Sequence, residues 1–177
     1  TIGGIGGDAS VAQYARQSSA SGLAAIWARE NTREALWDAM ARKEVYSTTG
    51  TRIRVRVFGG FDFVPDDLQR SDFASNAYAE GVPMGGDLSV APQGKVPAFL
   101  VQALRDPDGA NLDRIQIIKG WLDHAGNPHE RVYDIAVSNG RTIGADGRCK
   151  YPVGNTVNVE EATYTNAIGD GVLGAYW

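Results

Sequence analysis

The chain has 177 residues, a formal net charge of −4 at pH 7 and a sequence pI near 5.1. Hydrophobic residues make up 43% of it, enough for the core of one ordinary domain, or of a small domain with part of another. The acidic balance argues against nucleic acid as a partner, because nucleic-acid binders normally carry a basic footprint, and no apolar run approaches the roughly 18 residues of a membrane span.

The single cysteine, Cys149, permits no disulfide within the chain and leaves the compartment open. No signal peptide opens the sequence, but the mature form of an exported protein would also lack one. We favour an exported or periplasmic location, and a cytoplasmic one stays open. The chain starts at Thr1 and stops at Trp177 after an apolar stretch. We therefore expect it to be a fragment of a longer protein.

Glycines punctuate the first 20 residues. Residues 4–9 (GIGGDA) formally satisfy a relaxed dinucleotide-binding fingerprint. That fingerprint requires a preceding strand, and only three residues precede it here. A glycine-rich loop is the expected structure.

One amphipathic helix is predicted over residues 32–42. Asn31 and Glu34 are three residues apart, which fits a capping box at its start. Leu36 and Met40 belong to an apolar stripe at helical spacing, which predicts a buried helix face.

From residue 51 the pattern changes to strict alternation, which is typical of a strand with two different faces. The apolar set is Ile53, Val55 and Val57, and the basic set is Arg52, Arg54 and Arg56. Further strands are predicted over residues 97–105, 113–121 and 130–138, with a loop-rich stretch at 64–94. Short turns join several of these strands, which indicates a mainly β (α+β) fold built as an antiparallel immunoglobulin-like β-sandwich. We expect residues 51–177 to form it, after a glycine-rich lead and helix in residues 1–50.

Several long motifs carry a family resemblance. They read GLAAIWARENTREALWDAMARKEVYSTTGTRIRVRVFGGFDF, AYAEGVPMGGDL, ALRDPDGANLDRIQIIKGWLD, VYDIAVS and PVGNTV, and together they span nearly the whole chain from Gly22 onward. The tract resembles the C-terminal part of a large bacterial family, domain-of-unknown-function family 3604. The resemblance implies PHP-like (polymerase and histidinol phosphatase) metal-dependent hydrolases, with His-x-His and Asp-x-His metal motifs on an N-terminal distorted αβ barrel.

This chain lacks those metal motifs. Its two histidines, His124 and His129, straddle a predicted turn, whereas a PHP-like centre needs a cluster of His, Asp and Glu ligands. The resemblance therefore implies no catalytic residue and no metal cofactor in this chain, with a divalent metal in an upstream catalytic domain that is its partner. The leading hypothesis is a non-catalytic accessory region of such a hydrolase, and the alternative is a ligand-binding or protein-interaction module. Aromatic platforms at Trp121, Tyr133 and Tyr151, exposed on one face, would favour the alternative. Burial of the same three side chains would favour a packing role for them.

The row Arg52, Arg54 and Arg56 is the candidate ligand-binding feature. Guanidinium groups on one strand face can grip a phosphate, sulfate or carboxylate, which implies a small anionic ligand. The alternative is a solvated sheet face whose arginines pair with neighbouring carboxylates.

Two other clusters have ordinary alternatives. Asp106, Asp108 and Asn111 suggest a calcium loop, but its twelfth position is not an acid, so a plain turn is the expected structure. His124 and His129, each next to an acidic residue, could serve as metal or acid–base groups, and exposed turn histidines are the commoner case.

Overall fold

The computed structural model describes residues 22–177, so the glycine-rich start and its fingerprint lie outside the described residues. The strands are β1 (Leu23–Ile26), β2 (Val45–Thr48), β3 (Arg54–Gly60), β4 (Gly81–Pro83), β5 (Ala98–Leu104), β6 (Arg114–Leu122), β7 (Pro128–Val137) and β8 (Val172–Tyr176). The helices are α2 (Arg33–Ala41), α3 (Phe73–Glu80) and the short 3-10 helix η1 (Pro65–Gln69). The mainly β class is confirmed, as are the strands expected at β3, β5, β6 and β7.

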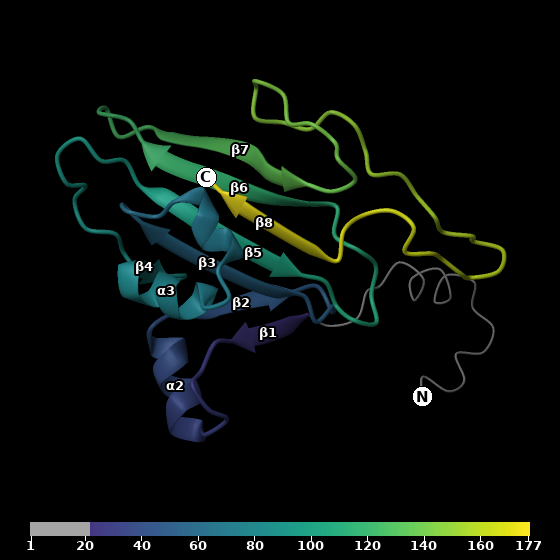
Figure 1. Ribbon diagram of the computed structural model, residues 1–177, viewed down its shortest axis with the longest axis horizontal. Coiled ribbons are helices and arrows are strands. Elements are labelled where there is room, and N and C mark those ends of the chain that lie inside the picture. Colours follow the sequence, from purple (N-terminus) through teal and green to yellow (C-terminus); the bar gives the residue numbers. More distant parts are fainter. Residues whose placement is uncertain (1–21) are drawn as a thin grey trace.

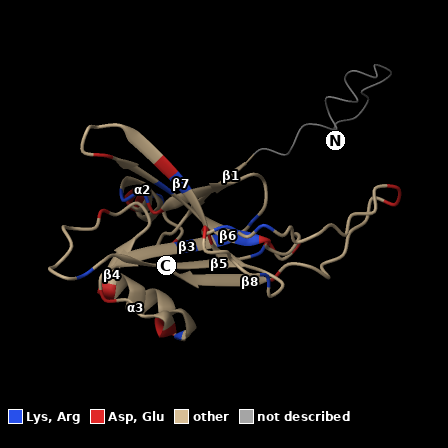
Figure 2. Ribbon diagram, turned by 90° about the horizontal axis from the view of Figure 1, so that it is seen from above, with Lys and Arg blue, Asp and Glu red and all other residues tan. Residues whose placement is uncertain are grey.

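All the strand pairs are antiparallel (Figure 1). The largest sheet has the order β4-β3-β5-β8, while β1 pairs with β2 and β6 pairs with β7 in two-stranded sheets. Seen from above, α3 lies on one side of the four-stranded sheet and the β6–β7 hairpin on the other (Figure 2). The layered arrangement follows from a central sheet that has apolar side chains on both faces.

One core lies between the four-stranded sheet and α3. Phe58 of β3 is 2% exposed and packs with Leu100 of β5 against Phe73 and Ala77 of α3. The rings of Phe58 and Phe73 meet edge to face, with centroids 5.8 Å apart, a favoured geometry for aromatic pairs.

A second core fills the space between the same sheet and the hairpin. Ala103 and Leu173 are buried there, and Val55 of β3, Ile115 of β6 and Ala136 of β7 pack against their cluster. Val55 of the predicted apolar face thus packs toward the hairpin, whereas Phe58 shares the opposite face with Arg54 and Arg56 and belongs to the first core.

The start of α2 differs from the predicted capping box. Thr32, rather than Asn31, is the N-cap, and its hydroxyl accepts a hydrogen bond from the Ala35 N–H at 3.3 Å. A hydroxyl one residue later in the chain thus occupies the capping position. At the other end Lys43 adopts φ 61° and the Glu44 N–H donates to the Ala39 carbonyl, the Schellman arrangement that ends many helices.

Three elements were not expected from the sequence. Residues 45–48, between the predicted helix and strand, pair with β1 as strand β2, and α3 and β4 occupy the stretch expected to be loop-rich. The helix α3 has no side-chain cap at Asp72, so its start carried no signal. Gly81 of β4 allows a close approach, since a Cβ there would lie 2.4 Å from the Gly59 carbonyl oxygen. No helix in residues 22–177 is long and apolar enough to cross a membrane.

Candidate anion-binding site

Two of the three arginines in the predicted binding row share one face of the four-stranded sheet. Arg54 pairs with Leu104 and Arg56 with Gln102 in the β3–β5 register. Alternate residues of a strand point to the same face and lie about 6.6 Å apart, so the two guanidinium groups can reach a common ligand. The predicted alternation holds for Arg54 and Arg56, which belong to β3, whereas Arg52 precedes the strand.

Arg52 instead stabilises the turn after β5. Its backbone N–H donates to Asp106 Oδ2 at 2.7 Å, and its guanidinium pairs with Asp106 and Asp108. The N–H of Arg52 is the main reason that the pKa of Asp106 lies below its ordinary value. The Gly109 N–H donates to the Asp106 carbonyl at 3.0 Å, which closes the expected turn. Arg52 therefore has a structural role in this turn.

Arg56 is held over an aromatic ring. Its guanidinium carbon lies 3.8 Å from the ring centroid of Trp27, which follows β1. The Trp27 indole is itself fixed, because its Nε1–H donates to the Val55 carbonyl of β3 at 2.8 Å. A guanidinium stacked on an indole keeps its N–H edges free to bind, since the ring contacts only its face.

A cavity of about 300 Å³ opens between these groups. Its lining includes Trp27, Arg54, Arg56, Gln102, Leu104 and Val172. No carboxylate lines it in the described part of the chain, and within residues 22–177 neither Arg54 nor Arg56 forms an ion pair. Two cations and a side-chain amide thus face a space free of acids.

A larger cavity, of about 680 Å³, shares Trp27 and Arg56 with the first. Its acid, Glu44, is only 3% exposed. Glu44 accepts a hydrogen bond from the Tyr78 hydroxyl at 2.6 Å and pairs with Arg42 at 2.9 Å. Burial and then the Glu44 carboxylate raise the pKa of Tyr78. Arg42 and Tyr78 thus each contact one Glu44 oxygen. Arg56 lies 5.9 Å from the Tyr78 ring centroid and forms no ion pair with Glu44.

The histidines lie at the end of the β6–β7 hairpin. His129 Nε2 is 3.1 Å from Asp123 Oδ2, and both histidines are exposed. Hydrogen bonds from Asn127 and then from His129 lower the pKa of Asp123 to about 2. Residues 22–177 contain no group of three or more His, Cys, Asp or Glu side chains placed to hold a metal. The pair therefore has the geometry of a turn-stabilising contact.

The aromatic platforms differ in exposure. Trp121 is 41% exposed and Tyr151 70% exposed, while Tyr133 is half-buried with its ring 5.2 Å from that of Trp177. Cys149 is buried, and its backbone N–H donates to the buried Asp134 carboxylate at 2.6 Å. Its position indicates a structural cysteine.

Sequence reasoning missed Trp27 and Gln102 as parts of the site. Trp27 gave only the signal of an aromatic residue after a short apolar run, which is more often core. Gln102 becomes a neighbour of Arg56 only through the β3–β5 register. A register is fixed by the whole sheet, so no local pattern could have revealed this contact.

A protein-family model described as "Protein of unknown function (DUF3604)" matches residues 5–177. Neither the curated proteins nor the solved structures contain a significant match to this chain. The match covers the four-stranded sheet and the segment that carries Trp27, so both lie within the region that the family model describes.

Proposed function

The chain belongs to the DUF3604 family, and we propose that it is a non-catalytic accessory region which holds a small oxyanion between Arg54 and Arg56. The oxyanion is a phosphate, sulfate or carboxylate group of a larger molecule. The parent enzyme in this proposal is a PHP-like metal-dependent hydrolase of bacteria.

The observation that supports the proposal most is the environment of the Arg56 side chain. This guanidinium is half-buried, lies 3.8 Å from the Trp27 ring centroid and borders a cavity of about 300 Å³. Within residues 22–177 it has no carboxylate partner, although Arg52 nearby has two. A surface arginine that only solubilises the sheet would not need a stacked and hydrogen-bonded support.

The chemistry of the cavity suits an oxyanion. A guanidinium presents several N–H donors in a fixed plane, which match the oxygens of a phosphate or carboxylate, and such charge-assisted hydrogen bonds are about twice as strong as neutral ones. The Gln102 amide adds a neutral donor on the neighbouring strand. Stacking on Trp27 restricts Arg56 before binding, so less side-chain entropy is lost when the anion arrives.

The accessory role is supported by the exposed face of α2. Trp37 is 68% exposed and Met40 45% exposed, and α2 extends away from the sheets (Figure 1). A large apolar surface on a short projecting helix is unfavourable in water and typical of a contact region. In this proposal α2 packs on the catalytic barrel, which supplies the divalent metal, and the hairpin and four-stranded sheet form an immunoglobulin-like sandwich.

Calorimetric titration with phenyl phosphate tests the anion site. Arg54→Met and Arg56→Met should each weaken binding by about tenfold, because each removes charged hydrogen bonds to the anion. Arg52→Met is the matched control, since this arginine serves the turn, and it should leave affinity unchanged. Equal affinity in all four proteins, or no binding by the wild type in low salt, would refute the site.

A separate measurement addresses the non-catalytic part of the proposal. The purified chain, dialysed against zinc and manganese and then against buffer, should retain no stoichiometric metal by elemental analysis. One retained equivalent that is lost in a His129→Ala variant would contradict that part alone.

A further inference from the structure

The β6–β7 hairpin carries a second set of basic and aromatic side chains. Lys119 pairs with Arg131, and Trp121 with His129, in the hairpin register. Directly paired residues of two antiparallel strands lie on the same face, and so do alternate residues along each strand. All four side chains, together with Tyr133, therefore belong to one face of the hairpin.

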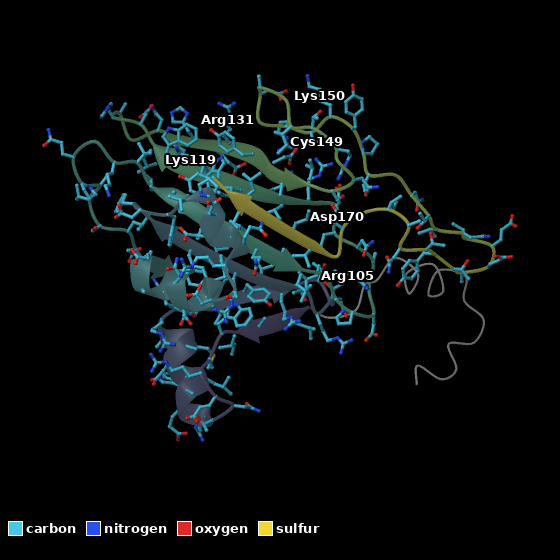
Figure 3. The ribbon with its side chains drawn as sticks, viewed as in Figure 1. Arg105, Lys119, Arg131, Cys149, Lys150 and Asp170 are labelled. Carbon is cyan, nitrogen blue, oxygen red and sulfur yellow. The ribbon has the colours of Figure 1, made fainter. Side chains whose placement is uncertain are left out.

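The two permanent cations of this face lack carboxylate partners within residues 22–177. Lys119 and Arg131 are exposed and form none of the ion pairs in that part of the chain. Arg131 donates to the Asp146 carbonyl at 3.2 Å, and its guanidinium lies 4.8 Å from the Tyr133 ring centroid. Figure 3 shows Lys119 and Arg131 near each other on the hairpin, with Lys150 on the separate loop beyond it.

Trp121 provides a supported flat surface beside these cations. Its ring stacks on His129 with centroids 5.3 Å apart and an interplanar angle of 18°. His129 is fixed by Asp123 at 3.1 Å, and the Lys119 ammonium lies 5.6 Å from the Trp121 ring centroid. Trp121 nevertheless remains 41% exposed, so a ligand can reach an indole that is already held in place.

We propose that this face binds an acidic saccharide, with a uronic acid ring stacked on Trp121 and its carboxylate between Lys119 and Arg131. The C–H groups of one sugar face are apolar and pack flat against an indole. The carboxylate at the edge of the same ring then lies where an adjacent ammonium and guanidinium can donate to it. The site is separate from the Arg54–Arg56 cavity, so either can exist without the other.

The charge of the face favours this ligand over the alternatives. A neutral glycan would leave both cations without a role in binding. Single-stranded nucleic acid also combines stacking with negative charge, but it needs a cationic track for successive phosphates. This face offers two permanent cations on a chain of net charge −4, which suits an isolated carboxylate better than a polyphosphate backbone.

Affinity electrophoresis of the 177-residue chain in gels containing polygalacturonate tests the proposal. The wild type should be retarded, and Trp121→Ala and Lys119→Ala should each weaken the interaction by about tenfold, as expected from loss of stacking or of a charged hydrogen bond. Tyr151→Ala and Lys150→Ala are the matched aromatic and basic controls, and polygalacturonate should retard both as much as the wild type, each measured against its own mobility in a gel without the polysaccharide. Thermal unfolding of every variant establishes that the hairpin variants remain folded.

Three results would overturn the proposal. The first is migration of the wild type that polygalacturonate does not change. The second is equal retardation of the wild type and the folded Trp121→Ala protein. The third is equal or stronger binding to neutral dextran or to an oligothymidine. Retardation that is unchanged by Arg54→Met would show that the result is independent of the anion site on the four-stranded sheet.

Discussion

The guanidinium carbon of Arg56 lies 3.8 Å from the ring centroid of Trp27, although Arg56 belongs to the four-stranded sheet and Trp27 follows a strand of the β1–β2 sheet. The indole Nε1–H donates to the Val55 carbonyl, one residue before Arg56. The same aromatic side chain therefore links two sheets and positions a cation that forms no ion pair within residues 22–177. Trp27 thus has a structural role and, in the proposed site, a role in binding, and substitutions of Trp27 can separate the two.

Trp27→Phe should lower the free energy of unfolding by about 1 kcal/mol, the usual net contribution of one intramolecular hydrogen bond. The phenyl ring still lies beneath Arg56, so the affinity for phenyl phosphate should change by about twofold or less, because the cation–π contribution decreases without vanishing. Urea unfolding and calorimetry measure the two effects. Trp27→Ala, which also removes the ring, should weaken binding clearly more than Trp27→Phe, and equal affinities would contradict the stacking role.

Glu44→Gln should strengthen anion binding. The buried Glu44 carboxylate lines the larger cavity, which shares Trp27 and Arg56 with the smaller one. Removing its negative charge reduces repulsion of the ligand, so affinity for phenyl phosphate should rise by about two- to fivefold at low ionic strength. Stability should fall by about 1–3 kcal/mol, because Arg42 loses its carboxylate and the polar group stays buried. Weaker binding by a folded Glu44→Gln protein would oppose the electrostatic argument.

Phe58→Ala and Met40→Ala should differ strongly in stability. Phe58 is 2% exposed and contacts α3, so its loss should cost about 3–5 kcal/mol. Met40 is 45% exposed, so its substitution should cost less than about 1 kcal/mol in this chain. The spacing of the α2 residues predicted that Met40 is buried, and its exposure shows that this prediction is wrong. A large destabilisation by Met40→Ala would mean that α2 docks within this chain rather than on a catalytic domain.

Asp123 gives the hairpin end a defined response to acid. Its pKa is lowered to about 2 in the folded chain, mainly by Asn127 and then by His129, against about 3.9 for an unperturbed aspartate. A depressed pKa stabilises the fold above the unfolded value, and that stabilisation is lost as the pH falls from about 4 through about 2. The amide proton shifts of Ala125 and Asn127, which donate to this carboxylate, should titrate with a midpoint near 2 in NMR spectra. A midpoint near 4 would show that the contacts do not persist in solution.

The strands were largely predictable because their signals are local. Alternation in β3 and the apolar run of β5 identify both strands, and the same alternation places Arg54 and Arg56 on one face. Element α3 was missed because Asp72 does not cap it with its side chain. Residues 45–48 form a strand by pairing with β1. Their Ser-Thr run is typical of a turn, so the local sequence did not indicate this pairing.

The candidate site was only half predictable for a different reason. Arg52 looks identical to Arg54 and Arg56 in the sequence, yet Asp106 and Asp108 engage it across 54 and 56 residues of chain. Trp27 and Gln102 reach the cavity from two other strands or their ends. Such contacts depend on sheet order and register, so the row of arginines could suggest an anion site but could not show which arginines remain free.

The most direct test of the anion site observes the arginines themselves. In ¹⁵N-resolved spectra of the arginine Nε–Hε groups, addition of phenyl phosphate at low salt should shift the signals of Arg54 and Arg56, with Arg52 and Arg70 unchanged because aspartates already occupy them. Both shifts should saturate with one dissociation constant that weakens as sodium chloride rises. Uniform small shifts of all the arginine signals, or shifts of Arg52 alone, would contradict the account.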